Sequence, residues 1–578
     1  MNDPNGPMYY GSTYHLFTQY NPFGATWGHM SWSHSASLDL VHWWHLPVAL
    51  WPNQTYDKSG VFSGSATIVD GKPVIAYTCV GPKGQLQCLA RPVDASDPDL
   101  VEWVKDEANP VIATPPPGVP AGSFRDPTTA WRSGPVWRMA VGSSVDGHGR
   151  VAQYSTPDFE NWSFVGDMYA DASGSHGMFE CPDFYSAGDG SGNSTWVMKI
   201  SSDGDWYALG DYDEEAQSFA PRTPLRKYVE GSFYASKRFY DGPRARQTLF
   251  GWAQETSPTT VKRGWQGAQT LPLGVTYVPA SDVLAVYPIP ELSALRNQTQ
   301  VDNNTPIVVA PGGDVPVSAA AGLMLEVHAR FRLPAAEACP WRRCLHSRWA
   351  RAAAVDEEAC APAADPGAAT SYGVAVRASA DGSVQTRVGV AHVPTTGPLN
   401  NTDMPGGDYR DFGLPASAGA EANIANCSRT CLLEPECAAW TYVREGGPKD
   451  GLSVPRCSLK SSTEPTDTNQ WCVSGTVASM QLVVNQSRAG GDGKAVTYSQ
   501  SVPVTPDDTE AVISVWVDHS VLHSFYNAGT GRIVSRSYPD GSADGVRLFA
   551  SGSNASATVD SLQVYGLESI WIPGRPAQ

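Results

Sequence analysis

The sequence opens with Met1-Asn2-Asp3-Pro4-Asn5-Gly6, and this stretch carries the first candidate functional residue. Asp3 lies between an amide side chain and a proline. Proline restricts the residue before it to extended backbone, so we expect the Asp3 carboxylate to be held away from the chain. Gly6 then permits a turn that other residues disfavour. Taken alone, the stretch is also typical of an ordinary Asx-type turn.

Two later carboxylates have equally unusual neighbours, namely Asp126 before Pro127 and Glu180 between Phe179 and Cys181. Glycoside cleavage needs two carboxyls, one that attacks the anomeric carbon and one that protonates the leaving oxygen. The apolar neighbours of Glu180 predict a carboxyl that stays protonated near the working pH. The polar turn around Asp3 predicts an ionised one. Arg125 is expected to keep Asp126 charged and anchored.

The composition predicts a mainly β protein. Charged residues make up only 17% of the 578 residues, while 55 glycines and 46 prolines supply turns between short aromatic and β-branched runs. Over residues 1–290 such runs recur at even spacing, which is typical of a sandwich, a barrel or a propeller. Periodicity does not choose among these three.

The charge and the cysteines restrict the partners and the compartment. A formal charge of −18 argues against nucleic acid or an anionic membrane surface as a partner, and no apolar run is long enough to span a membrane. Eight of the 11 cysteines lie between residues 339 and 472. Nine glycosylation sequons add to the indication of a secretory-pathway protein, at Asn53, Asn161, Asn193, Asn297, Asn303, Asn400, Asn426, Asn485 and Asn554. The chain begins directly on its first motif without a signal peptide, so we expect a processed or trimmed form, or a misplaced start.

The second half is predicted to be a β-sandwich. Residues 291–305 are polar and typical of a linker, and 306–578 are again rich in strand-like runs. Two segments interrupt this pattern: an Ala/Pro-rich loop at 334–370 and a cysteine-rich module at 396–475. Cys79 and Cys88 flank a hairpin-like turn at 80–84 and could pair across it, whereas the odd cysteine count leaves Cys181 as the candidate free thiol.

The cysteine-rich module contains Cys427-Ser-Arg-Thr-Cys431, then Cys437-Ala-Ala-Trp440-Thr-Tyr442 and Cys457. It resembles a PAN/apple-type domain, a small disulfide-held binding module. We therefore expect an accessory module whose target is a glycan or a protein. An alternative is that this module dominates and that the protein is an adhesive or matrix component.

Several separated motifs occur in the order seen in glycoside hydrolase family 32, the family of invertases, fructan hydrolases and plant-type fructosyltransferases. They are Asn2-Asp3-Pro4-Asn5-Gly6, Phe62-Ser63-Gly64-Ser65-Ala66-Thr67, Arg125-Asp126-Pro127, Glu180-Cys181-Pro182, Tyr234-Ala235-Ser236-Lys237, Gly251-Trp252-Ala253 and Val517-Asp518-His519-Ser520. The resemblance covers most of the chain except 334–370 and 396–475. It implies an all-β protein, with a five-bladed β-propeller at 1–290 followed by the sandwich.

The resemblance also implies roles for the three acids. Asp3 corresponds to the nucleophile, Glu180 to the general acid/base and Asp126 to the transition-state stabiliser. The implied activity is that of a retaining β-fructofuranosidase that hydrolyses terminal β-D-fructofuranosyl residues of sucrose or fructans, without a metal or cofactor. The positions that match the fructose pocket are Asn2, Gln19, Trp27, Phe62, Ser63 and Arg125. The implied location is secreted, in the cell wall or the vacuole.

Other interpretations of these residues remain open. Trp27 and Trp32 are equally compatible with core aromatics. The histidines at 29, 34, 42 and 45 invite a metal interpretation, but they lack the Cys/His spacing of a metal site.

Two departures from the family pattern concern the choice of sugar. Sucrose-cleaving members usually carry Trp in place of Phe62. They also commonly place an Asp and a Lys where this chain has Val229 and Ser232, although Glu230 could substitute by a one-residue shift. Losing these polar contacts to glucose can change substrate preference strongly. A fructosyltransferase and a catalytically weak carbohydrate-binding protein are therefore the alternatives to a hydrolase.

Overall fold

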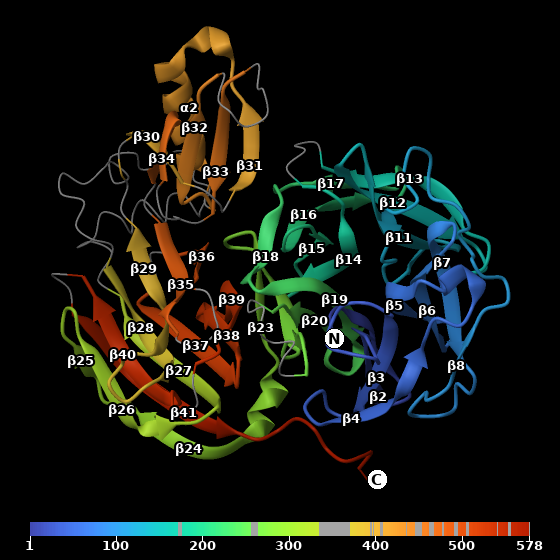
Figure 1. Ribbon diagram of the computed structural model, residues 1–578, viewed down its shortest axis with the longest axis horizontal. Helices are drawn as coiled ribbons and strands as arrows, with labels where there is room; N and C mark the ends of the chain where they lie inside the picture. The colour runs from blue at the N-terminus through green and yellow to red at the C-terminus, as the bar shows by residue number, and fades with distance from the viewer. Residues whose placement is uncertain are drawn as a thin grey trace. The chain divides into compact units, whose positions relative to one another are not determined.

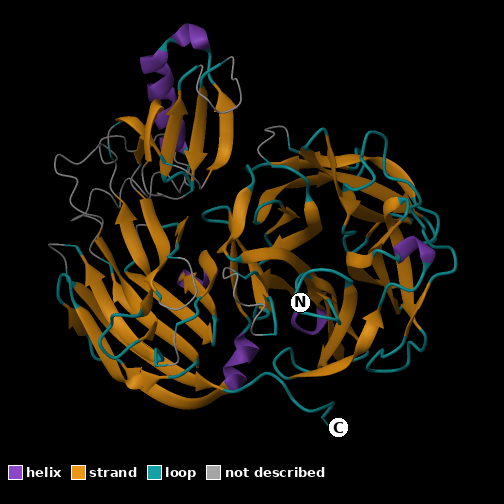
Figure 2. Cartoon of the chain, viewed as in Figure 1, coloured by secondary structure: helices purple, strands orange, loops and turns teal. Residues whose placement is uncertain are grey.

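The computed structural model describes residues 1–171, 176–255, 264–333 and 370–576, apart from short gaps within the last range at 394–395, 397, 405–407, 435, 446–453, 462–466, 477–478, 490–494, 505–507, 540–541 and 553–555. The chain divides into two units. The first comprises Met1–Tyr277, Val286–Arg296 and Glu568–Gln578, and the second comprises Val278–Ala285 and Asn297–Leu567. Strands dominate both units (Figure 2). Among the described residues, no helix is long and apolar enough to cross a membrane.

The described residues of the first unit form five antiparallel sheets arranged in a ring, which is a five-bladed β-propeller (Figure 1). Each blade follows the previous one along the chain. The strands are β1 (Pro4–Tyr10), β2 (Thr13–Tyr20), β3 (Ser31–Ser37) and β4 (Trp43–Leu50); β5 (Gly60–Val69), β6 (Lys72–Gly81), β7 (Gly84–Pro92) and β8 (Trp103–Lys105); β9 (Phe124–Arg125), β10 (Trp131–Ser133), β11 (Val136–Val145), β12 (His148–Thr156) and β13 (Ser163–Ala170); β14 (Glu180–Gly188), β15 (Ser194–Ser201), β16 (Asp205–Asp213), β17 (Ser218–Pro221) and β18 (Arg226–Gly231); and β19 (Phe233–Asp241), β20 (Arg246–Ala253), β21 (Ala268–Gln269) and β22 (Leu273–Val278).

Strand β6 shows why the blades contain continuous apolar runs. Its residues alternate between the two faces of the sheet. Ile75 and Tyr77 pack in a core that includes Phe17 and Trp32 of the first blade. Val74 and Ala76 pack in another core with Phe124 and Met139 of the third blade. A blade enclosed between two others therefore needs apolar side chains on both faces of its sheet. A half-exposed sheet would instead show alternating apolar and polar residues.

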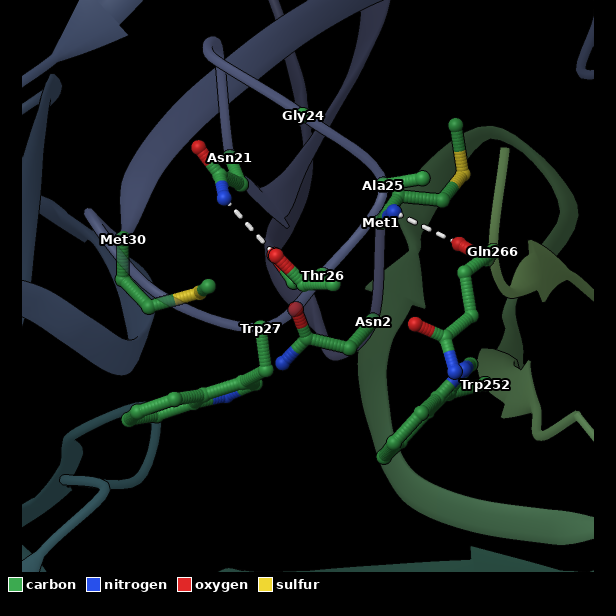
Figure 3. A pocket seen from close by; sticks show the side chains of 10 residues that line it. All are labelled: Met1, Asn2, Asn21, Gly24, Ala25, Thr26, Trp27, Met30, Trp252 and Gln266. Carbon is green, nitrogen blue, oxygen red and sulfur yellow. Dashed lines mark hydrogen bonds between the residues drawn. The ribbon is translucent and has the colours of Figure 1, made fainter. Parts of the chain in front are cut away.

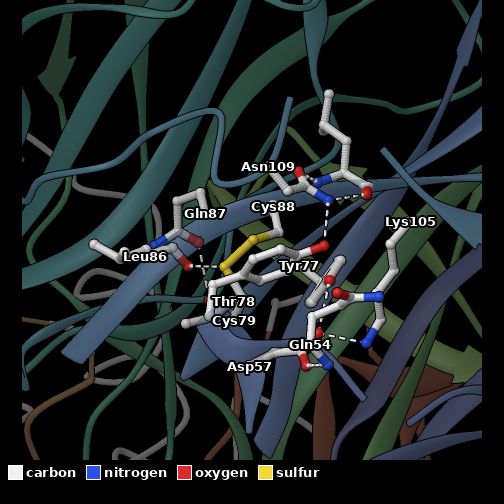
Figure 4. Close-up of a disulfide and its surroundings, with 12 residues drawn as sticks. Gln54, Asp57, Tyr77, Thr78, Cys79, Leu86, Gln87, Cys88, Lys105 and Asn109 are labelled. Atoms are coloured by element: carbon white, nitrogen blue, oxygen red, sulfur yellow. Dashed lines mark hydrogen bonds and ion pairs between the residues drawn. A yellow bond between two sulfur atoms is a disulfide. The ribbon is translucent and has the colours of Figure 1, made fainter. Parts of the chain in front are cut away.

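The predicted pairing of Cys79 with Cys88 is confirmed. The disulfide joins β6 to β7 with a Cα–Cα distance of 5.9 Å, and both cysteines are fully buried (Figure 4). Cys181 is buried and forms no disulfide, as the odd cysteine count suggested. The predicted loop at 334–370, with three cysteines, lies outside the described residues except for its last position.

The second unit contains the predicted β-sandwich. One sheet has the order β39-β38-β37-β27-β41-β24, and the other has the order β26-β40-β28-β29-β35-β36. Their facing apolar residues form one core, with Val327 and Val515 from the first sheet and Val390 and Leu482 from the second. The strands are β24 (Arg296–Asn303), β26 (Asp314–Ala321), β27 (Met324–Arg332), β28 (Thr370–Ala378), β29 (Gln385–Val393), β35 (Ser479–Arg488), β36 (Thr497–Ser501), β37 (Glu510–Asp518), β38 (Val521–Tyr526), β39 (Gly531–Arg536), β40 (Gly545–Ser551) and β41 (Ala557–Leu567).

The cysteine-rich segment forms a sheet of its own beside the helix α2 (Ala420–Leu433). Among the described residues of this module, two disulfides join its elements. Cys427 on α2 pairs with Cys457 on a strand, and Cys431 pairs with Cys437. The sheet order is β30-β34-β32-β33-β31, with bounds β30 (Leu399–Asp403), β31 (Asp408–Gly413), β32 (Ala439–Val443), β33 (Arg456–Lys460) and β34 (Asp467–Thr476).

The structure differs from the predicted linker at 291–305 and from the predicted end of the sandwich. A 3-10 helix, η4, spans Pro290–Leu295, and β24 follows it directly. The polar residues of β24 are largely exposed, so a surface strand resembled a linker in the sequence. Residues Glu568–Gln578 belong to the first unit, because Trp43 exchanges backbone hydrogen bonds with Ile570 and Ile572 at 2.8 and 2.9 Å.

Candidate active site

The three acids lie at the beginnings of blades. Asp3 directly precedes β1, Asp126 directly follows β9, and Glu180 is the first residue of β14. They therefore come from the first, third and fourth blades. The propeller brings together carboxylates that are separated by more than fifty residues in the sequence, which local sequence patterns did not predict.

Asp3 is held by a chain of side-chain hydrogen bonds. Asn2 Nδ2 donates to Asp3 Oδ1 at 3.1 Å, and Ser63 Oγ donates to Asp3 Oδ2 at 2.5 Å. Gln19 connects the two donors, because its Oε1 accepts from Asn2 at 2.5 Å and its Nε2 donates to Ser63 at 2.8 Å. Asn2, Gln19 and Ser63, three of the predicted binding residues, thus orient Asp3. Gln19 lies on β2 and Ser63 on β5, and Asn2 is the residue before Asp3.

Cys181 connects Asp3 to Asp126. Its backbone N–H donates to Asp126 Oδ2 at 2.9 Å. Its Sγ lies 3.5 Å from Asp126 Oδ2 and 3.7 Å from Asp3 Oδ2. Both Asp126 and Cys181 have left-handed backbone, with φ of 69° and 44°. Such strained positions in non-glycine residues cluster at functional sites, and here they turn a carboxylate and a thiol toward one another.

Glu180 is enclosed by polar partners. Arg125 donates to Glu180 Oε1 from Nη2 at 2.5 Å and from Nε at 3.0 Å, and the Tyr234 hydroxyl donates to Oε2. The motif that contains Tyr234 stood out in the sequence, but we assigned no role to this tyrosine. Only the fold shows that β19 presents its hydroxyl to the carboxylate at the start of β14.

The apolar environment predicted for Glu180 is wrong. Its neighbours Phe179 and Phe184 face the core, where they stack on Tyr169 and Trp196 with centroid distances of 5.9 and 4.6 Å. Phe179 precedes β14, and the pairing of β14 is irregular between Glu180 and Asp183, so the flanking residues do not describe the surroundings of the carboxylate. The carboxylate to which Arg125 donates hydrogen bonds is likewise Glu180, and not its sequence neighbour Asp126.

The prediction that Asp3 lies in a setting that favours ionisation is also wrong. The pKa of Asp3 is raised to about 6, mainly by burial and also by the nearby carboxylates of Asp126 and Glu180, against the hydrogen bonds from Ser63 and Asn2. Burial also raises the pKa of Asp126, although the guanidinium of Arg125 acts in the opposite direction. Burial and the neighbouring negative charges therefore affect the pKa of Asp3 more than the polar residues next to it in the sequence do.

This pKa leads to a prediction about stability. The pKa of Asp3 is raised in the folded protein, so the ionised carboxyl costs folding free energy above pH 6, and this cost disappears as the pH falls below about 4. We expect Asp3→Asn to raise the free energy of unfolding by about 1–2 kcal/mol at pH 7, after allowance for a weakened Ser63 hydrogen bond. At pH 4 we expect little change. Denaturant unfolding at both pH values measures the difference.

The control for this prediction is Asp70→Asn, in an exposed turn with left-handed backbone that asparagine tolerates. It should leave the free energy of unfolding nearly unchanged at both pH values. An equal effect of Asp3→Asn at pH 4 and pH 7, or a destabilisation at pH 7, would contradict a raised pKa of Asp3.

Buried cations support the strands that carry these groups. Lys199 forms an ion pair with Asp205 at 3.0 Å and donates to the backbone oxygens of Cys181 and Ser236 at 3.1 and 2.8 Å. Lys237 donates to the Pro182 oxygen at 3.0 Å. The Tyr234-Ala235-Ser236-Lys237 motif therefore fixes the backbone around Cys181 as well as presenting the tyrosine.

A hollow of about 90 Å³ lies next to Asn2 (Figure 3). Figure 3 shows Asn2 between the side chains of Trp27 and Trp252. The indole of Trp27 is 64% exposed and meets Phe62 edge to face at 5.6 Å, whereas Trp32 is fully buried in the core. The full lining comprises Met1, Asn2, Asn21, Gly24, Ala25, Thr26, Trp27, Met30, Trp252 and Gln266.

The histidines that invited a metal interpretation have other partners. His34 lies 3.0 Å from His15 in the core, His42 contacts Asp39 at 2.8 Å, and His45 stacks on Trp571 at 3.9 Å. Within the described ranges, no group of three or more His, Cys, Asp or Glu residues could hold a metal ion.

Comparison with known proteins agrees with this architecture. The family model for the N-terminal domain of glycosyl hydrolases family 32 matches residues 1–288, and that for the C-terminal domain matches 291–566. The chain is 33% identical to sucrose:sucrose 1-fructosyltransferase from Festuca arundinacea, over 98% of this chain and 78% of that protein. It is 32% identical to acid beta-fructofuranosidase 2, vacuolar, from a Rosa hybrid cultivar, over 99% and 80%.

Solved structures show a similar fold over the full length. Fructan 1-exohydrolase IIa from Cichorium intybus is 27% identical, and the alignment covers 99% of this chain and 96% of that chain with a TM-score of 0.74. A variant of the same exohydrolase in complex with 1-kestose gives a TM-score of 0.76.

Proposed function

The chain belongs to glycoside hydrolase family 32, and on that premise we propose that it is a retaining β-fructofuranosidase acting on terminal fructosyl residues of sucrose or fructans. The observation that carries the proposal is the convergence of Asp3, Asp126 and Glu180 around Cys181. Relatives of this family include a vacuolar acid β-fructofuranosidase, so we propose a vacuolar or cell-wall location.

In the proposed first step, an Asp3 oxygen attacks C2 of the fructosyl unit while the C2–oxygen bond breaks. Glu180 gives its proton to the leaving oxygen, which departs as a sugar hydroxyl, and Asp3 becomes esterified to C2. Ser63 and Asn2 keep the attacking carboxylate in a fixed orientation. Asp126 is proposed to bind fructosyl hydroxyls, and its bond from Cys181 holds it beside Asp3.

In the proposed second step, Glu180 accepts a proton from water, and the water oxygen attacks C2 and releases Asp3. Two inversions at C2 give net retention. The contacts of Arg125 and Tyr234 on the two oxygens of Glu180 fix the position of this carboxyl for both steps. A sugar hydroxyl in place of water would give a fructosyltransferase, the second candidate, which the Festuca relative makes reasonable.

We expect the sugar preference to depend on Phe62. Its ring contacts the exposed Trp27, whereas Val229 is only 2% exposed and offers no polar group to a glucose unit. Phe62→Trp should therefore raise the ratio of kcat/KM for sucrose over inulin by about 3- to 10-fold, since one altered pocket contact is typically worth about 1 kcal/mol. Product analysis on sucrose, inulin and levan with both proteins measures this ratio.

The same experiment tests the proposed activity. Free fructose as the main product supports the hydrolase, and longer oligosaccharides from sucrose would assign the transferase. No turnover on any of the three substrates would leave only a carbohydrate-binding role. Phe23→Tyr is a matched control, because Phe23 is an exposed aromatic that contacts His29 and lies outside the pocket lining.

We further propose that the module at 396–475 is an accessory that binds a glycan or protein target. Two disulfides among its described residues and a sheet of its own hold the module together. Deleting 396–475 should lower binding to cell-wall material at least about 10-fold and leave kcat/KM for sucrose within about 2-fold. Unchanged binding after deletion would contradict this role.

A further inference from the structure

A second sugar-related feature lies in the turn Trp51-Pro52-Asn53-Gln54-Thr55, which connects β4 to the 3-10 helix η1 (Thr55–Asp57). Asn53 and Thr55 form a glycosylation sequon, and an aromatic residue stands two positions before the asparagine. Asn53 is exposed, and the side chain of Trp51 is 50% exposed although it is a large apolar group. The half-exposed indole offers an apolar face on which a sugar ring can pack.

The turn is rigidly anchored. The buried carboxylate of Asp57 accepts the backbone N–H groups of Asn53 and Gln54 at 3.2 and 2.9 Å, and also the hydroxyl of Tyr77 at 3.1 Å. Lys105 forms an ion pair with the same carboxylate. Figure 4 shows Gln54, Asp57 and Lys105 next to the Cys79–Cys88 disulfide, so the base of the turn is joined to the second blade.

The amide of Asn53 is oriented by one of these groups. Lys105 Nζ donates to Asn53 Oδ1 at 2.7 Å and to the Trp51 backbone oxygen at 2.6 Å. This leaves Asn53 Nδ2 without a hydrogen bond in the part of the chain that the structure describes. The sequon residues Asn161 and Asn193 differ, because their Nδ2 atoms donate to Asp158 at 2.8 Å and to Asp189 at 2.7 Å.

A hollow of about 140 Å³ adjoins the turn. Trp51, Asn53 and Lys105 line it together with Ala49, Leu50, Gln54, Trp103 and Val104. The side of the turn next to Asn53 therefore combines an exposed indole with polar groups, which matches a pyranose with an apolar face and polar edges. The anchored turn loses little conformational entropy when such a group packs on it.

We propose that Asn53 carries an N-linked glycan whose first N-acetylglucosamine packs against the indole of Trp51. The glycan is transferred from a lipid-linked oligosaccharide donor in the secretory pathway. A bond forms between Asn53 Nδ2 and C1 of the first sugar, Nδ2 loses one proton, and the donor leaves as the lipid diphosphate. The sugar covers apolar surface that the protein itself leaves exposed, and so it stabilises the propeller.

The test is a double-mutant cycle on the full chain secreted from a eukaryotic host. Thr55→Ala removes the glycan but keeps Asn53 and Trp51, while Trp51→Ala removes the packing surface but keeps the sequon. Peptide mass spectrometry should find the glycan on Asn53 in the native protein and not in Thr55→Ala. The loss of glycan should lower Tm by about 2 °C in the native background and by less than about 0.5 °C in the Trp51→Ala background.

Two further proteins keep the result interpretable. Thr55→Ser retains the sequon and should retain the native Tm, and Trp51→Phe retains an aromatic face if Trp51→Ala does not fold. An unmodified Asn53 in the secreted protein would overturn the proposal. An equal loss of Tm in both backgrounds, or the same loss from Thr55→Ala in protein made without glycans, would also overturn it.

Discussion

Asp3→Asn is expected to lower kcat on sucrose at least about 10⁴-fold, because it removes the nucleophile while keeping nearly the same shape. The asparagine oxygen can still accept the hydrogen bond that Ser63 or Asn2 gives to the native carboxylate. The surrounding network therefore stays in place, and the lost rate reports the missing covalent step. Steady-state kinetics give the loss, and calorimetric titration with fructose should give a Kd within about 3-fold of the native value.

Trapping of the covalent intermediate tests the nucleophile directly. Rapid quenching of the native enzyme with substrate should leave a fructosyl group on the peptide that contains Asp3, and Asp3→Asn should show none. Asp126→Asn is the matched variant, because Asp126 is buried and lies against the same thiol. It should slow the reaction but still allow the ester to form on Asp3. Turnover within about 10-fold of native for Asp3→Asn would assign the nucleophile elsewhere.

The pH dependence of the same rate follows from the carboxyl cluster. Asp3 must be ionised to attack, and burial raises its pKa to about 6 in the free protein. The acidic limb of kcat/KM therefore reports Asp3 together with Asp126, whose pKa burial also raises, and not one residue alone. The sequence predicts an Asp3 that ionises readily, because the sequence shows neither the burial of Asp3 nor the carboxylates that lie near it in the fold.

The fold class followed from composition and turn spacing, but the number of blades did not. Strand β6 has apolar residues on both faces because two neighbouring blades cover it. A buried strand in a barrel or a sandwich can show the same apolar run, so the run does not indicate how many blades there are. Only the family resemblance implied a five-bladed propeller. The surface strand β24 resembles a linker in the sequence because its side chains are mostly exposed.

The sequence predicted which acidic residues form the candidate site, but it did not predict which residues surround them. Asp3, Asp126 and Glu180 stood out through their proline, arginine and cysteine neighbours. Their surroundings come from other blades, as Arg125 shows by contacting Glu180 in place of Asp126. The roles of Tyr234 and of the Cys181 backbone likewise depend on contacts across 54 and 55 residues of sequence.

Glu180→Ala is expected to show a different pattern of loss from Asp3→Asn. Without a proton donor, sucrose cleavage should fall about 10³- to 10⁴-fold, since its leaving oxygen needs protonation. A fructoside with an acidic phenol as the leaving group needs less help, so its first step should fall less than about 100-fold. The second step still lacks a base, and the fructosyl enzyme should therefore accumulate as a burst of phenol.

Azide separates this role from a structural one. It attacks C2 without losing a proton, so it should restore turnover of the phenyl fructoside in Glu180→Ala and give fructosyl azide with retained configuration. Asp126→Ala should gain nothing from azide, because Asp126 handles no proton in the proposed steps. Tyr234→Phe removes a hydrogen bond from Glu180 but leaves the carboxyl, so it should reduce the rate about 10-fold and shift the pH profile. Failure of azide to accelerate Glu180→Ala would assign the acid/base to another group.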